Sequence, residues 1–203
     1  TEDQVKTHFA LIDSHTSDIV NDDRSVIKRF LRGLDFYLVQ DFDSSIADMT
    51  QAILLDDTFF PAYFVRALLR CKQLEYMKAE AIIDSNLPHQ ARSQENEVGK
   101  FNMEYELIRK DLDKVIEIAP DYVYAYYNRG YVLSQLKDYR GALADYDKAI
   151  SLYPNFAEAY FNRGLIHIFI GDNNKGVSDL SKAGELGIAS AYNIIKRFSL
   201  VQN

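Results

Sequence analysis

The chain has 203 residues, which is enough for one domain with a sizeable core or for an extended array whose core runs along its length. Hydrophobic residues make up 47% of it and only 9 Gly and 4 Pro interrupt it, so the composition excludes a disordered chain and favours long helices. The formal net charge of -7 repels phosphate groups, which argues against general binding to nucleic acid or to anionic membranes.

The single cysteine and the absence of a long apolar run exclude several classes of protein. Cys71 is the only cysteine, which rules out an internal disulfide and a multi-cysteine metal site but leaves cytoplasm and periplasm both open. No run approaches the roughly 18 to 20 apolar residues that a bilayer span needs, so we expect a soluble segment without membrane insertion. The start at Thr1 rather than at Met suggests a portion of a longer protein.

Residues 1–25 form the first predicted element. Val5, Phe9 and Ile12 recur at helical spacing and predict an N-terminal helix. Two interpretations of this helix stay open. It either covers the first repeat described below or is the remainder of an earlier repeat.

A recurring Arg-Gly or Arg-Ala dipeptide divides residues 26–190 into units. Its small residue is in turn Gly33, Ala67, Gly130 and Gly164, so the first and last intervals are equal and the middle interval is nearly twice as long. The additional residues of the middle interval belong either to a degenerate fifth unit or to an insertion in the second unit.

The Asp that follows each Arg decides between these alternatives. Three Arg residues are followed by an Asp at one constant offset, in the pairs Arg32 and Asp48, Arg129 and Asp145, and Arg163 and Asp179. At the same offset after Arg66 the chain has Ile82, and adding the excess length of the middle interval leads to Asp111. We therefore favour an insertion near residues 71–101. The predicted units are 26–59, 60–122 with the insertion, 123–156 and 157–190.

Each unit has the pattern of two helices joined by a short turn. In the third unit the small and aromatic positions are Tyr126, Gly130, Ala142, Tyr146, Ala149 and Pro154. With its 34-residue period, this pattern resembles the tetratricopeptide repeat (TPR) family over about residues 26–190. The resemblance implies an all-α, right-handed superhelical solenoid of TPR helix-turn-helix hairpins. Other units depart from the family pattern at Ser45, Asp57, Ile108, Gly176 and Ile188.

The last element, residues 191–203, is predicted to be a C-terminal capping helix. Tyr192, Ile195 and Phe198 lie at helical spacing and would face the last repeat, while Lys196 and Arg197 point elsewhere. A solenoid needs such a polar end, because its last repeat otherwise exposes apolar surface.

The four Arg residues could in principle bind an anionic ligand. Because each has an Asp at a matching offset, we interpret them as structural ion pairs that tie the first helix of a unit to the second. The predicted pairs are Arg32–Asp48, Arg66–Asp111, Arg129–Asp145 and Arg163–Asp179.

Catalytic and cofactor motifs are missing from the sequence. His8, His15, His89 and His167 are scattered and have no metal-ligand spacing such as HExxH. Gly-rich phosphate loops and a GxSxG elbow are also absent. We therefore expect no enzymatic activity, no metal site and no cofactor.

The resemblance to TPR proteins implies a concave groove, lined by the first helix of each unit, in which a peptide lies. Family members that clamp a terminal carboxylate use Lys and Arg together with Asn on this face, and only the Asn residues occur here. We therefore expect an apolar segment, held by aromatic packing and by Asn contacts to its backbone. The alternative is that these aromatics pack against a neighbouring helix or the rest of the chain. The candidate groove residues are Phe30, Leu34, Tyr37, Phe64, Leu68, Tyr124, Tyr127, Asn128, Tyr131, Glu158, Phe161, Asn162 and Leu165.

The insertion is a second candidate contact site. Its MKAEAIID stretch predicts a short helix and its SNLPHQARSQENEVGK stretch a polar loop, for which we favour a solvated loop over a contact site. The main functional hypothesis is a non-catalytic scaffold for a protein or peptide partner. The alternative is a structural module that self-associates or docks onto the remainder of its own longer chain.

Overall fold

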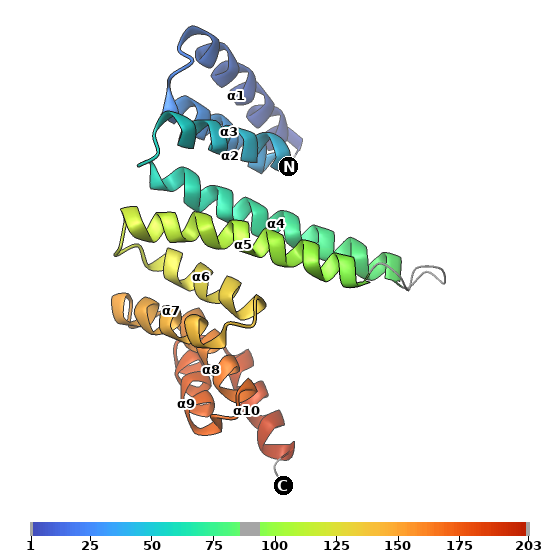
Figure 1. Ribbon diagram of the computed structural model, residues 1–203, viewed down its shortest axis with the longest axis vertical. Coiled ribbons are helices and arrows are strands. Elements are labelled where there is room, and N and C mark those ends of the chain that lie inside the picture. The colour runs from blue at the N-terminus through green and yellow to red at the C-terminus, as the bar shows by residue number, and fades with distance from the viewer. Residues whose placement is uncertain (1, 86–93, 202–203) are drawn as a thin grey trace. The chain divides into compact units, whose positions relative to one another are not determined.

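The computed structural model describes residues 2–85 and 94–201, and within these segments all regular structure is α-helical. The chain divides into two compact units, Thr1–Pro120 and Asp121–Asn203. Each unit is built from helices that pack on their neighbours in chain order (Figure 1).

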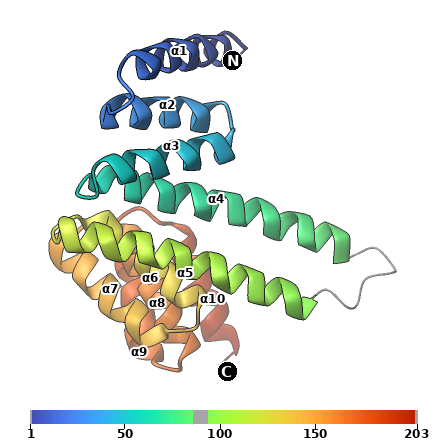
Figure 2. The same ribbon diagram turned by 45° about the horizontal axis from the view of Figure 1, so that its top comes forward.

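The first unit contains five helices in the part that the structure describes. Each packs on the next, so that α2–α3 and α4–α5 form hairpins and α1 covers α2 (Figure 2). Between α2, α3 and α4 lies a core of Met49, Ala52, Ala62 and Leu69, onto which Phe30 and Leu34 also pack. The helices are α1 (Glu2–Asn21), α2 (Val26–Leu38), α3 (Phe42–Leu55), α4 (Phe60–Ser85) and α5 (Gln94–Ile118).

The second unit repeats the same arrangement. Helices α6 and α7 form one hairpin, α8 and α9 the next, and α10 packs on α9. Leu180, Ala183 and Ala191 form a core that Ile194 and Ile195 of α10 extend. The helices are α6 (Val123–Gln135), α7 (Tyr139–Leu152), α8 (Ala157–Phe169), α9 (Asn173–Glu185) and α10 (Ser190–Val201).

The short turns inside the hairpins share one local design. Gln40 and Lys137 adopt positive φ angles of 65° and 64°, and the following Asp41 and Asp138 are the N-caps of α3 and α7. Each Asp side chain accepts a hydrogen bond from the backbone N–H three residues later, at 3.1 and 2.9 Å. A left-handed residue followed by an Asp N-cap therefore reverses the chain at each of these two places.

Close approach of the paired helices depends on their small residues. A Cβ added to Gly130 would lie 3.0 Å from the ring of Tyr146, and one added to Gly164 would lie 3.1 Å from the carbonyl oxygen of Gly176. Ala67, at the corresponding position of α4, is buried, as is Ile108 of α5. The α4–α5 hairpin therefore accommodates larger side chains at these positions than the other hairpins do.

Two helices are long where the sequence predicts an insertion. Helix α4 has 26 residues and α5 has 25, whereas α2 and α3 have 13 and 14. As a result α4 and α5 extend well past α2 and α3 (Figure 2). The MKAEAIID stretch continues α4, and the prediction of a polar loop is wrong for residues 94–100, which lie in α5. Residues 86–93 of that predicted loop lie outside the described residues.

The terminal helices bury only part of the faces expected for them. On α1 the buried apolar residues are Ile12 and Ile19, while Val5 and Phe9 are exposed. On α10 the residue buried against the core is Ala191, with Ile194 and Ile195 beside it, and half of the Tyr192 surface is exposed. Of the predicted stripe, Ile195 and Phe198 are half-buried, and the Tyr192 ring lies beside Gly184 of α9, while Lys196 and Arg197 are exposed. No helix among the described residues is long and apolar enough to cross a membrane.

Candidate binding face and the arginine bridges

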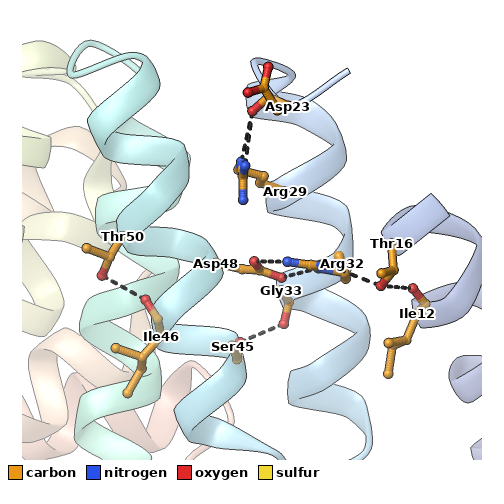
Figure 3. Close-up of polar contacts among 10 residues, drawn as sticks. All are labelled: Ile12, Thr16, Asp23, Arg29, Arg32, Gly33, Ser45, Ile46, Asp48 and Thr50. Carbon is orange, nitrogen blue, oxygen red and sulfur yellow. Dashed lines mark hydrogen bonds and ion pairs between the residues drawn. The ribbon is translucent and has the colours of Figure 1, made fainter. Parts of the chain in front are cut away.

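The structure brings all four predicted Arg–Asp pairs together. Arg32 donates from Nε and Nη2 to the two carboxylate oxygens of Asp48, over 2.7 and 2.6 Å (Figure 3). Arg66 meets Asp111 in the same two-pronged way, over 2.9 and 2.6 Å. All four Asp residues are buried. Two parallel hydrogen bonds to a buried carboxylate fix both the distance and the rotation of the paired helices.

The pairs in the second unit have the same geometry. Arg129 lies 2.7 Å from each oxygen of Asp145, and Arg163 lies 2.7 Å from each oxygen of Asp179. The hydrogen bonds to Asp179 raise the pKa of Arg163 above its already high usual value, despite the opposing effect of burial. The guanidinium therefore stays charged at any pH at which the protein is folded.

Arg32, Arg66 and Arg163 also donate to the preceding helix. Figure 3 shows Arg32 lying between Asp48 and Thr16 of α1, whose hydroxyl accepts from Nη1 at 3.2 Å. The Nη1 of Arg66 donates to Thr50 of α3 at 3.0 Å, and that of Arg163 to Asp147 of α7 at 2.6 Å. Each acceptor stands 16 residues before its Arg. Each of these Arg residues is a bridge across three helices.

This bridging bears on the two interpretations of the N-terminal helix. Thr16 has the same relation to Arg32 that Thr50 of α3 has to Arg66. In the sequence the two threonines are one repeat period apart. Because α3 is the second helix of a repeat, this relation favours α1 as the second helix of an earlier repeat. In the sequence, the polar residue 16 positions before each Arg is the signal that could have predicted this role of α1.

The proposed groove residues of the first unit differ in accessibility. Tyr37 and Leu68 are exposed, while Phe64 is half-buried. Phe30 and Leu34 are half-buried against the core, and the ring of Phe30 lies 5.2 Å from that of Phe59. Sequence reasoning missed three exposed apolar residues of α2. These are Ile27, Leu31 and Leu38. Transferring the positions of the candidates Tyr124 and Asn128 to the first unit would have found Ile27 and Leu31.

In the second unit, the proposed groove positions lie on α6 and α8. Tyr124 is 48% exposed and Leu165 is 37% exposed, and Glu158 is also exposed. Tyr131 and Phe161 are half-buried, and Phe161 packs on the core below α8. Phe169, at the end of α8, is 70% exposed and was not among the predicted residues.

Tyr127 and the two Asn residues are engaged within the protein. The ring of Tyr127 lies 4.7 Å from that of Phe156, and its hydroxyl accepts a hydrogen bond of 3.2 Å from Asn162 Nδ2. Burial raises the pKa of Tyr127. Asn128 Nδ2 donates to the carbonyl oxygen of Tyr124 at 2.7 Å. These three side chains are therefore held by contacts within the protein, and the Asn128 amide keeps its second N–H and its oxygen for another contact.

Metal-binding geometry is absent from the described part of the chain, where no three His, Cys, Asp or Glu side chains gather as a metal ion requires.

Two family models described as "Tetratricopeptide repeat" match the sequence, at residues 123–156 and 145–177. These matches fall on the helices whose small and aromatic positions have the family's packing. The chain is a tetratricopeptide repeat protein.

Solved structures resemble this TPR protein over most of its length. It is similar to the crystal structure of MamA, with 21% identity, a TM-score of 0.67 and 89% of each chain covered. A MamA fragment from Desulfovibrio magneticus RS-1 has 14% identity and a TM-score of 0.65, with 91% of this chain and 95% of that one covered. TTC0263, a TPR protein from Thermus thermophilus, has 12% identity and a TM-score of 0.61, with 97% and 91% covered.

At such identities the likeness shows the fold alone. The predicted fold class, an all-α solenoid of TPR hairpins, is confirmed. No curated protein matches the sequence.

Proposed function

We propose that this TPR protein is a non-catalytic scaffold that binds an apolar segment of a partner protein on the exposed face of α6 and α8. The observation that carries the proposal is the pair of exposed anchors on this face, Tyr124 and Leu165. Aromatic and aliphatic side chains of this kind dominate the energetics of protein interfaces once a partner excludes water from them.

Charge on this face limits the chemistry of the partner. Glu158 is the one charged residue among the proposed groove positions of α6 and α8. Arg129 and Arg163 stand on the same helices but are bound to buried Asp145 and Asp179. A terminal carboxylate would therefore meet a negative charge and no available cation from these helices. The partner that fits is an apolar segment with a basic residue opposite Glu158.

Selection from a random peptide display library on the whole chain tests this proposal. We expect the selected peptides to be rich in apolar residues, to contain Lys or Arg, and to be poor in Asp and Glu. Tyr124→Ala combined with Leu165→Ala should weaken the selected peptides about tenfold or more, since each exposed anchor contributes about 1 kcal/mol or more. Tyr127→Ala is a poorer probe, because Tyr127 is half-buried and packs on both Phe156 and Tyr146, so its loss would also disturb the fold. Tyr124 also contacts Phe156 but is 48% exposed.

Two further variants show whether the loss of binding is specific to the proposed face and to its charge. Leu54→Ala removes a side chain that is 72% exposed on α3, which is not one of the helices of the proposed face, and should leave peptide binding unchanged. Glu158→Lys should reverse the charge preference and select acidic peptides. Equal peptide binding by the double variant and the original chain would end the proposal. Light scattering that shows a dimer, lost in the same double variant, would favour self-association instead.

A further inference from the structure

A cavity of about 500 Å³ lies among α7, α8 and α9, and the groove proposal does not use it. None of its lining residues is a proposed groove residue. Its polar lining consists of Asp147 from α7, Arg163 and His167 from α8, and Lys175, Ser178 and Asp179 from α9.

His167 is a buried polar side chain without a hydrogen-bond partner. The residue is only 9% exposed, and its Nδ1 atom has no donor or acceptor within reach. The carboxylate of Asp172 lies 3.7 Å away, which is too far for a hydrogen bond. Buried polar atoms are nearly always satisfied in folded proteins, and an unsatisfied one costs about 1 to 3 kcal/mol. His167 therefore leaves the fold with an unsatisfied polar atom beside the cavity.

The other repeats show what fills this place. The residue four positions after the bridging Arg is Phe36 on α2, Arg70 on α4, Leu133 on α6 and His167 on α8. Arg70 donates from Nη1 to Asp111 Oδ2 at 2.7 Å, so Asp111 accepts hydrogen bonds from two guanidinium groups. Asp179 has only Arg163 as a side-chain partner in the described residues. At the place where the second hairpin has a second guanidinium, the fourth has a cavity.

The charged side chains around the cavity have a net charge of one negative unit. Arg163 binds Asp179 and Asp147, and Lys175 binds Asp172 at 2.8 Å. The three carboxylates outnumber these two cations by one negative charge. A single positive group would therefore balance the cluster, whereas an anion would add to the excess.

We propose that this cavity binds the guanidinium group of an arginine side chain from a partner protein, in the place that corresponds to Arg70. A guanidinium has five N–H donors in one plane, enough to meet several acceptors at once. Two acceptor groups line the cavity, namely Asp179 Oδ2 and the exposed carboxylate of Asp147. An ammonium has no such planar array.

The test uses Nα-acetyl-arginine amide as the probe and the whole chain as the protein, with the imidazole signal of His167 followed by NMR. We expect a saturable shift of that signal. The citrulline analogue has the same shape without the charge and should bind about tenfold more weakly, since hydrogen bonds to charged groups are worth about 1.5 to 3 kcal/mol. Absence of a saturable response, equal binding of the citrulline probe, or preferential binding of inorganic phosphate would each overturn the proposal.

His167→Arg supplies the missing guanidinium from within the chain, as Arg70 does in the second hairpin. The variant should keep or raise the melting temperature and should lose probe binding, which calorimetry can follow in place of the His167 signal. A folded variant that still binds the probe contradicts the proposal. If the variant does not fold, Asp147→Asn decides, because it should weaken the probe while the exposed Asp13→Asn on α1 should not. Unchanged affinity in Asp147→Asn overturns the proposal.

Discussion

The hydroxyl of Ser45 donates a hydrogen bond of 2.6 Å to the carbonyl oxygen of Gly33 where α2 packs on α3. Ser45 is fully buried and occupies the position that Ala142 has in α7 and Gly176 in α9. A polar side chain is tolerated there because a backbone acceptor from the facing helix satisfies its hydroxyl. The departure from the family pattern thus adds a contact between helices.

The first prediction concerns this serine. Ser45→Ala should lower the free energy of unfolding by about 1 kcal/mol, the net value of one hydrogen bond. Ser45→Val should cost about 1 to 3 kcal/mol, because one methyl group replaces the hydroxyl and the second has no space between the helices. Urea unfolding measures both values. Ser151→Ala, whose exposed hydroxyl donates within its own helix, is the control and should change little. A Val variant as stable as the original chain would contradict the packing argument.

The repeat period explains why much of the fold could be predicted from the sequence. Because the period is constant, two residues with the same spacing as Arg32 and Asp48 form the same contact in each repeat where that spacing occurs. The departure at Arg66 then located the added residues before Asp111, and the structure brings these two side chains together.

Other features depend on contacts that the sequence does not reveal. Residues 94–100 read as a polar loop, yet they lie in a helix, and the α4–α5 pair to which they belong buries Leu74, Tyr105 and Ile108. Tyr127 stands on the predicted groove side of α6, but Phe156 from the start of the next hairpin covers it. Periodicity identifies the faces of a helix without telling which of them a later element covers.

The second prediction tests the ion pairs. Asp145→Ala removes a buried carboxylate that accepts two hydrogen bonds from Arg129. Breaking a buried pair from one side costs about 3 to 5 kcal/mol, so the melting temperature should fall clearly. Glu185→Ala breaks the exposed pair with Lys182 and should change it little. Thermal unfolding followed by circular dichroism compares the two variants, and similar melting temperatures would remove the structural role assigned to the pair.

The third prediction ranks two glycines by what a methyl group would meet. At Gly164 the nearest atoms include the carbonyl oxygen of Gly176 at 3.1 Å, which is backbone and moves only with its helix. At Gly33 the nearest atom, at 2.6 Å, is the terminal methyl of Met49, which can rotate away. Gly164→Ala should therefore destabilise the fold more than Gly33→Ala, by about 1 kcal/mol or more. Urea unfolding of the two variants checks the order, and the reverse order would contradict it.

The fourth prediction concerns the only cysteine. Burial in α4 raises the pKa of Cys71 to about 12, and the charge of Glu75 one turn later adds to the effect. At pH 8 the native thiol is therefore almost wholly protonated, and it should react with a thiol-specific disulfide reagent far more slowly than the same chain in guanidinium chloride, because the thiolate is the nucleophile. Equal rates in the two conditions would show that the thiol is neither buried nor shifted.

The same shift fixes the sign of a pH effect on stability. Above pH 9 the thiol of the unfolded chain loses its proton while the folded chain keeps it up to about pH 12, so the folded state binds more protons over this interval. The contribution of Cys71 is fully present below pH 9 and declines as the pH rises through this interval. Cys71→Ala has no thiol to titrate and should lose less unfolding free energy between pH 8 and pH 10 than the original chain. Urea unfolding at both pH values measures the difference, and parallel losses in the two proteins would contradict it.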